Sequence, residues 1–425
     1  MEQKKYQVGG GSAVTTLVVL SILWFLNYAD RSIMAVALTP IKQSVSLSDA
    51  QAGLLGSLVT LGIAALTIPA AIFGDRWARR KVIMVMGLTW SFFTLVTGLA
   101  TQFWHLAVAR FMVGSGEAGY SPVGLAWVGV SFRKEMRSLI LGIFYAVGQL
   151  GTVAGLIFGG MLIAATQDWR IPFYVFAIPG VIMAIAALFL RDYKVVKSKD
   201  EAAFSKQYFK DWGQIFKIKS FWLISATYTF FFFMVYSLTT WLPSLLIRAY
   251  GMDVGQAGLT FGLITLAVIF GPLGGFLGDK WQKHNKNGRP YYIAVTAFLS
   301  IVLFLIALLN VGSPLPVFLA LFTVANVVLS LNIPVGLTII QDTTPPGLRS
   351  TATGLVTFIN MVGATLGIYY SGAVSDALGG GSHGLQFGLI YTMPFAALAV
   401  ISGFIMAKYY HPDSAKISDE LLAEK

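Results

Sequence analysis

Apolar runs of about twenty residues recur along the whole chain, separated by short polar segments. Runs of this length predict membrane-spanning helices, because a barrel would instead show short segments of alternating polarity. The predicted spans cover residues 13–38, 51–73, 82–101, 105–128, 137–164, 170–190, 220–246, 257–278, 291–310, 314–338, 349–375 and 385–408. The pattern therefore predicts an all-α membrane protein with twelve transmembrane helices.

One long polar stretch divides these spans into two groups of six. We expect a cytoplasmic N-terminus (1–12), an N-terminal six-helix bundle (13–190), a cytoplasmic linker (191–219), a C-terminal six-helix bundle (220–408) and a cytoplasmic tail (409–425). An even number of spans places both termini on the same side. That side carries 25 of the 30 Lys and Arg residues, so the positive-inside rule predicts that it is the cytoplasm.

Composition supports this class of protein. Hydrophobic residues make up 56% of the chain and charged residues 12%, about half the charged share of a soluble domain. The net charge of +11 is explained by the basic cytoplasmic side, so it does not indicate a nucleic-acid partner. The chain has no cysteine, which excludes disulfides and thiol chemistry.

The two halves repeat one another. Residues Gly74–Trp77 (GDRW) match Gly278–Trp281 (GDKW) 204 positions later, and Arg137-Ser138 match Arg349-Ser350 at an offset of 212. The second match continues through the glycine pairs Gly142/Gly354, Gly151/Gly363, Gly155/Gly367 and Gly160/Gly372. Two six-helix repeats of the same orientation predict the major facilitator fold, two pseudo-symmetric bundles with a binding site near the membrane midplane.

Two motifs resemble those of the major facilitator superfamily. Gly74–Arg80 is similar to its loop signature between helices 2 and 3, and Arg110-x-x-x-Gly114-x-Gly116 is similar to its helix-4 signature. More narrowly, Asn27–Arg31 and Gly116–Pro122 resemble the organic anion:cation symporters and the Spinster-like branch. A drug antiporter is a further, less favoured alternative within the superfamily. Proton-coupled drug antiporters carry a Gly-Pro pair in their fifth helix, and the predicted fifth span (137–164) lacks this pair.

Four ionisable residues lie inside predicted spans: Asp30, Arg31, Arg110 and Glu117. A charge at this depth costs about 2.5–3.5 kcal/mol on insertion scales, so such residues usually serve a polar pathway or binding site. Arg31 and Arg110 offer planar donors that suit a carboxylate or phosphate. Asp30 and Glu117 suit proton carriers, because desolvation favours the protonated carboxyl group. The alternative is a fixed ion-pair network that only joins helices 1 and 4.

Further candidates surround these charges. We expect polar and aromatic side chains to contribute to substrate binding, although many aromatics of such helices only pack or face lipid. These candidates are Asn27, Tyr28, Tyr120, Tyr145 and Gln149 in the first half, and Tyr228, Tyr236 and Asn360 in the second. The family resemblance implies that the loop signature and its repeat take part in gating. The gating candidates are therefore Asp75, Arg76, Arg79, Asp279 and Lys280.

The residues contain no constellation of an enzyme and no metal-ligand spacing, so we expect neither catalysis nor a cofactor. The leading prediction is a secondary active transporter that works by alternating access and carries a small organic anion, a carboxylate or sugar acid, together with protons. The alternative is a Spinster-like proton-coupled transporter of lysolipids or other amphiphiles. In either case we expect a monomer in a bacterial inner membrane.

Overall fold

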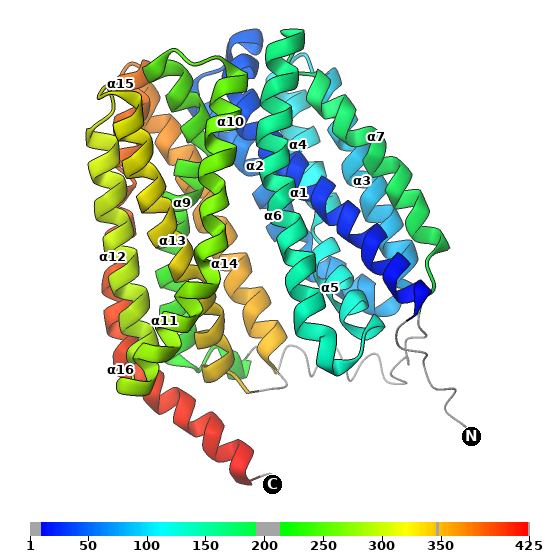
Figure 1. Cartoon of the computed structure of the whole chain (residues 1–425), viewed down its shortest axis with the longest axis vertical. Coiled ribbons are helices and arrows are strands. Elements are labelled where there is room, and N and C mark those ends of the chain that lie inside the picture. Colours follow the sequence, from blue (N-terminus) through cyan, green and yellow to red (C-terminus); the bar gives the residue numbers. More distant parts are fainter. Residues whose placement is uncertain (1–9, 193–212, 346–347, 424–425) are drawn as a thin grey trace. The chain divides into compact units, whose positions relative to one another are not determined.

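The computed structural model describes residues 10–192, 213–345 and 348–423, and within them every regular element is a helix. Most of the predicted linker lies outside these residues. The chain divides into two compact units: Met1–Lys197 with Met252–Gly262, and Ser198–Gly251 with Leu263–Lys425. Each unit is a helical bundle (Figure 1). The all-α membrane fold that the sequence predicts is confirmed.

In the first unit, α1 packs against α6, α2 against α4, and α3 against both α4 and α7. Except for α3 with α4, these contacts join helices that are not consecutive in the sequence, as expected for a bundle of spanning helices. The elements are α1 (Gly11–Val45), α2 (Asp49–Arg76), α3 (Arg79–Leu99), α4 (Phe103–Glu117), α5 (Tyr120–Ser131), α6 (Lys134–Thr166), α7 (Ile171–Ala186) and the 3-10 turn η1 (Ala187–Phe189).

In the second unit, α9 packs against α14 and α16, α11 against α13, and α12 against both α13 and α16. This order of contacts repeats that of the first unit. The elements are α9 (Lys219–Tyr250), the 3-10 turn η2 (Leu266–Phe270), α11 (Gly271–His284), α12 (Gly288–Leu309), α13 (Leu315–Thr343), α14 (Arg349–Ala377), α15 (Gly381–Ile390) and α16 (Met393–Ala423). The remaining helix, α10 (Val254–Thr265), belongs to the first unit as far as Gly262 and to the second unit from Leu263.

The repeated glycines explain why the same helices pair in both units. At each of two positions in α6 and two in α14, an added Cβ would collide with the backbone of the facing helix. Each glycine faces one backbone carbonyl: Gly151 faces that of Phe25, Gly155 that of Ala29, Gly363 that of Thr229, and Gly367 that of Phe233. The faced residues are themselves 204 positions apart, the offset of the first sequence match. Small residues allow the close backbone contact that joins helices in a membrane.

The predicted span 105–128 is interrupted. The chain forms α4 up to Glu117 and α5 from Tyr120, because Pro122 has no N–H to bond the carbonyl of Ala118 and its ring would clash with that carbonyl. Neither piece is long enough alone, so eleven helices of the described residues meet the length and hydropathy expected of a span. Ala118 and Tyr120 are buried, which is where a membrane protein tolerates non-helical backbone.

The polar tail continues α16 as far as Ala423 and passes through Pro412. Asp413 accepts a hydrogen bond from the backbone N–H of Ser220 at 2.9 Å. This N–H belongs to the first turn of α9, whose leading amides have no partner within their own helix. The Asp413 carboxylate therefore caps the first turn of α9.

We expect Gly367→Ala to destabilise the protein by about 1–3 kcal/mol, the usual cost of overpacking. The new methyl group would meet the carbonyl of Phe233 and push α14 away from α9. Thermal unfolding of the purified protein measures the effect. Gly354→Ala on the same helix is the control, because no atom lies within 4 Å of that position. Equal melting temperatures for the two variants would contradict this account of the helix pair.

Candidate functional site

An ion pair joins α1 to the end of α4. Arg31 Nε donates to Glu117 Oε2 at 2.6 Å. The Arg31 side chain is 28% exposed, whereas that of Glu117 is fully buried. The α4 break next to Glu117 leaves this carboxylate at a helix end, where it faces α1. Arg31 is thus the more accessible charged group of this pair.

A second ion pair lies deeper between the same helices. Arg110 Nη1 is 3.5 Å from Asp30 Oδ2, and the two side chains are 0% and 3% exposed. The Arg110 guanidinium also lies over the ring of Phe173 on α7, 5.6 Å from its centroid. This contact is a cation–π interaction, which gains strength when water is excluded. Arg110 is therefore enclosed by its own unit.

The two pairs form one electrostatic group. The carboxylates of Asp30 and Glu117 are near enough to influence one another, and each also feels both arginines. The formal charges of the two carboxylates and the two guanidinium groups sum to zero. A change at the exposed member, Arg31, therefore alters the balance at every other member.

Aromatic rings gather around Trp24, next to Arg31. Trp24 stacks on Tyr120 with centroids 5.4 Å apart and on Phe144 at 5.3 Å. It also contacts Tyr28 at 4.8 Å and the edge of Tyr145 at 6.5 Å. We call these five residues the Trp24 cluster. Trp24 and Phe144 were not among the sequence candidates, because single aromatic residues within an apolar span cannot be distinguished from packing residues.

The members of the Trp24 cluster differ in exposure. Tyr120 is fully buried and donates a hydrogen bond from its hydroxyl to the carbonyl of Leu20. Tyr145 is 47% exposed and Tyr28 is half-buried. The Arg31 guanidinium lies 5.1 Å from the centroid of the Tyr28 ring. The first unit thus presents a cation with aromatic rings beside it.

Two other candidates of the first unit remain: one on α1 itself and one on α6. Asn27 is fully buried on α1, one turn before Asp30. Gln149 is half-buried on α6, the helix that packs against α1. Only Gln149 has a side chain within reach of solvent.

In the second unit, two of the three candidates are held by internal hydrogen bonds. The Tyr228 hydroxyl donates to the carbonyl of Asn332 at 3.1 Å, and Tyr228 is buried. Asn360 accepts a hydrogen bond from the Thr229 hydroxyl at 3.3 Å and is also buried. Tyr236 is half-buried and packs edge-to-face against Phe232 at 5.7 Å.

The gating candidates of the first unit lie where α2 ends and α3 begins. The side chains of Asp75 and Arg76, the last two residues of α2, lie outside the described residues. Arg79 is the first residue of α3 and is buried. The backbone N–H of Arg80 donates to Asp192 at 3.4 Å, which ties the start of α3 to the segment after η1.

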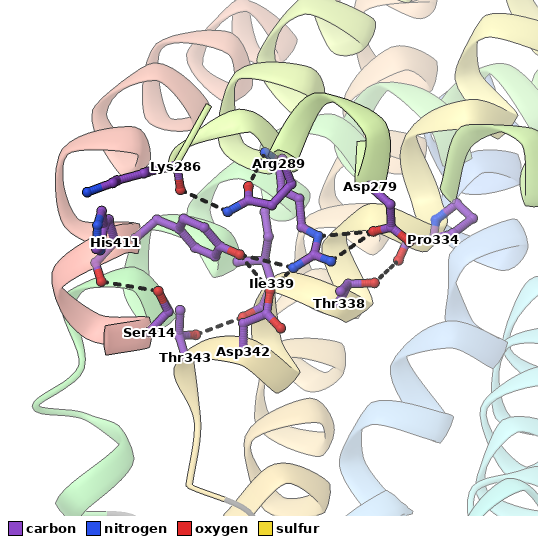
Figure 2. Close-up of polar contacts among 12 residues, drawn as sticks. Asp279, Lys286, Arg289, Pro334, Thr338, Ile339, Asp342, Thr343, His411 and Ser414 are labelled. Atoms are coloured by element: carbon purple, nitrogen blue, oxygen red, sulfur yellow. Dashed lines mark hydrogen bonds and ion pairs between the residues drawn. The ribbon is translucent and has the colours of Figure 1, made fainter. Parts of the chain in front are cut away.

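In the second unit, Arg289 at the start of α12 is the centre of a polar cluster (Figure 2). It donates to Asp279 at 2.8 Å and to the Tyr410 hydroxyl at 3.2 Å, and it pairs with Asp342. Tyr410 in turn donates to Asp342 at 2.6 Å. Lys280, the candidate next to Asp279, is exposed. Sequence analysis missed Arg289 as the partner of Asp279, although both flank the turn that repeats the loop signature.

Comparison with known proteins identifies the family. The sequence matches the profile of the Major Facilitator Superfamily over residues 20–294 and 286–425. It is 29% identical to an MFS-type efflux pump of Mycolicibacterium smegmatis, covering 85% of this chain and 84% of the relative. It is 28% identical to Protein spinster of Drosophila melanogaster, covering 87% of this chain and 63% of the relative.

A third relative is the sphingosine-1-phosphate transporter SPNS2 of Xenopus tropicalis, 27% identical over 86% of this chain and 74% of the relative. Among solved structures, a bacterial homolog to the human lysosomal transporter Spinster, inward-facing and unoccupied, has a TM-score of 0.83 at 22% identity, covering 95% of this chain and 99% of that chain. A D-xylose-proton symporter has a TM-score of 0.70 at 14% identity, covering 93% and 97%.

At such identities the solved structures establish the shared fold alone, whereas the profile spans most of the sequence. The protein is an integral membrane transporter of small molecules and not an enzyme. The chain belongs to the Major Facilitator Superfamily and resembles its Spinster-like branch.

Proposed function

We propose that the protein is a proton-coupled transporter of an anionic amphiphile, a molecule with a carboxylate or phosphate headgroup and an apolar tail. The observation that carries this proposal is the position of Arg31, partly exposed, paired with Glu117 and beside the Tyr28 ring. A guanidinium binds such headgroups through paired hydrogen bonds, and the exposed rings of the Trp24 cluster offer an apolar surface for the tail.

Competition for Arg31 provides the coupling. A substrate anion that binds Arg31 weakens its bond to Glu117 and leaves a buried carboxylate without its partner. Such a charge is costly in an apolar surround, so proton uptake becomes favourable. Because the site is then neutral, the transporter changes between its outward-open and inward-open states at a lower desolvation cost. Anion and proton binding are linked because they act on the same guanidinium.

The second candidate function is symport of a small organic anion, such as a sugar acid, with protons. The Arg31–Glu117 pair favours it equally, because this pair recognises the charge and not the tail. The Spinster-like relatives favour the amphiphile, and one of them is named as a sphingosine-1-phosphate transporter. The relative from M. smegmatis is named as an efflux pump, which is consistent with export.

The basic residues of the predicted cytoplasmic side support an orientation with both termini in the cytoplasm. We further propose a monomer in a bacterial inner membrane, with transport by alternating access between the two bundles.

Thermal stabilisation of the purified protein by lysophosphatidate and by glucuronate tests which anion binds. We expect lysophosphatidate to stabilise the wild type and Arg31→Ala to weaken its binding by about tenfold or more, since a charge-assisted hydrogen bond contributes about 1.5–3 kcal/mol. Arg31→Lys should also weaken binding, because a point charge does not replace the planar fork.

Lys283→Ala is the control for this experiment, because it removes an exposed positive charge from α11. Stabilisation by glucuronate alone would favour the small-anion function. Wild-type affinity in both Arg31 variants would remove Arg31 from the binding site.

We expect Asp30→Asn and Glu117→Gln to abolish accumulation driven by a pH gradient, because each variant lacks a carboxyl group that carries the proton. At least one should keep counterflow, which needs substrate exchange and no net proton movement. Both assays use the same proteoliposomes and radiolabelled lysophosphatidate. Asp168→Asn, which alters a carboxylate 42% exposed, is the control. Full accumulation in either site variant would show that its carboxylate is not essential for coupling, and a fixed ion-pair network would then explain the residue.

The loop signature suggests that Asp75, Arg76 and Arg79 latch the cytoplasmic side of the outward-open state, with Asp279 and Lys280 as a weaker counterpart. Asp75→Asn should then shift the population towards the inward-open state, because the amide cannot form an ion pair. Distances between spin labels across the cytoplasmic face measure this shift. An unchanged distance distribution would exclude Asp75 as a latch.

A further inference from the structure

Buried polar atoms without a hydrogen-bond partner are concentrated around the inner ion pair. Among the described residues they include Asn27 Nδ2 and Oδ1, both carboxylate oxygens of Asp30, and Nε, Nη1 and Nη2 of Arg110. Thr94 Oγ1 and Glu117 Oε1 belong to the same set. All five side chains come from residues less than 3% exposed. Native interiors leave few such atoms unsatisfied, so this concentration requires an explanation.

The direct contacts among these groups are long or poorly aligned. Arg110 Nη1 and Asp30 Oδ2 are 3.5 Å apart, which is longer than a charge-assisted hydrogen bond of about 2.7–2.9 Å. Thr94 on α3 lies beside Asp30, close enough to interact with its carboxyl group, but its hydroxyl makes no hydrogen bond of good geometry. A water bound beside such a long contact can bond to both groups and satisfy the donors and acceptors that the contact leaves unpaired.

The chemistry of the lining suits bound water. A buried water needs two to four polar partners and a polar site, whereas apolar cavities stay dry. Here an amide, a hydroxyl, a guanidinium and two carboxyl groups provide donors and acceptors. Asn27 lies three residues before Asp30 on α1, so both occupy the same face of that helix.

We propose that Asn27 and Thr94 hold bound water between Asp30, Arg110 and Glu117, and that this water relays a proton between the two carboxyl groups. The inference rests on the proposed proton coupling and adds two positioning residues to it. The charged and titratable groups around these atoms are Asp30, Arg110, Arg31 and Glu117, with the Tyr28 phenol beside Arg31 and Glu117.

The relay is balanced. The carboxylic acid of Asp30 gives its proton to the oxygen of a bound water, and a proton of the water chain passes to Glu117 Oε1. The products are the Asp30 carboxylate and the Glu117 carboxylic acid, and the water is regenerated. Arg110 keeps its charge throughout and stabilises whichever carboxylate is ionised.

Thr94→Val tests the inference, because valine keeps the shape of threonine and removes its hydroxyl. We expect the rate of lysophosphatidate accumulation under a pH gradient to fall by at least about tenfold, because loss of an assisted proton transfer commonly slows a step by that much or more. Counterflow should stay unchanged, and the pH profile of accumulation should shift. Thr94→Ser should restore transport, because it keeps the hydroxyl.

Thr97→Val is the matched control on the same helix. Thr97 is also fully buried, but its hydroxyl donates to the carbonyl of Phe93 at 2.8 Å within α3. We expect normal accumulation and a normal pH profile for this variant. If Thr94→Val behaves like Thr97→Val while Asp30→Asn loses accumulation, the relay is wrong and the proposed coupling stands. If Asp30→Asn keeps full accumulation, the proposed coupling itself fails.

A high-resolution structure of the wild type tests the water without any substrate. We expect ordered water bonded to Thr94, Asn27 and Asp30, and loss of at least one such water in Thr94→Val. The absence of any ordered water bonded to Thr94, Asn27 or Asp30 in the wild type would overturn the inference, whatever the transport assays show.

Discussion

The pairing of two carboxylates with two guanidinium groups between α1 and α4 is the constraint on which the first unit depends. Each charge alone would be costly in an apolar bundle, and removal of one partner leaves the other uncompensated. The helices must therefore keep their depth relative to one another, so that Arg31 meets Glu117 and Arg110 meets Asp30. The break after α4 serves the same requirement, because it ends the helix where Glu117 faces α1.

Much of the fold follows from local pattern and repetition. Hydropathy predicts the spans, and the glycine repeat predicts that the two halves are alike. The structure adds which helices approach closely, since Gly155 and Gly367 face carbonyls at equivalent places. Hydropathy could not reveal the break between α4 and α5, because the apolar run continues through it, although Pro122 is a local signal. The extension of α16 depends on Asp413 and Ser220, a tertiary contact between residues nearly two hundred positions apart.

The site was only partly predictable for a related reason. The charges at Asp30 and Glu117 stand out because burial makes them costly, but their partners depend on how α1 and α4 pack. Trp24 carries no such signal, since an aromatic residue in a span costs nothing. Arg289 was overlooked because it begins a helix at the membrane edge, where a basic residue is ordinary. Its role depends on Asp279, Asp342 and Tyr410 converging from three other helices.

The two ion pairs differ in a way that assigns them different tasks. A guanidinium does not release its proton, so only the carboxyl groups change charge. Arg31 is partly exposed and bonded directly, whereas Arg110 is enclosed and its contact with Asp30 is longer. In the proposed function, an incoming anion acts first on the outer pair, and the inner pair responds through electrostatics. The enclosure of Arg110 keeps bulk water from screening that response, so under this proposal anion binding at Arg31 and protonation of the carboxyl groups are linked.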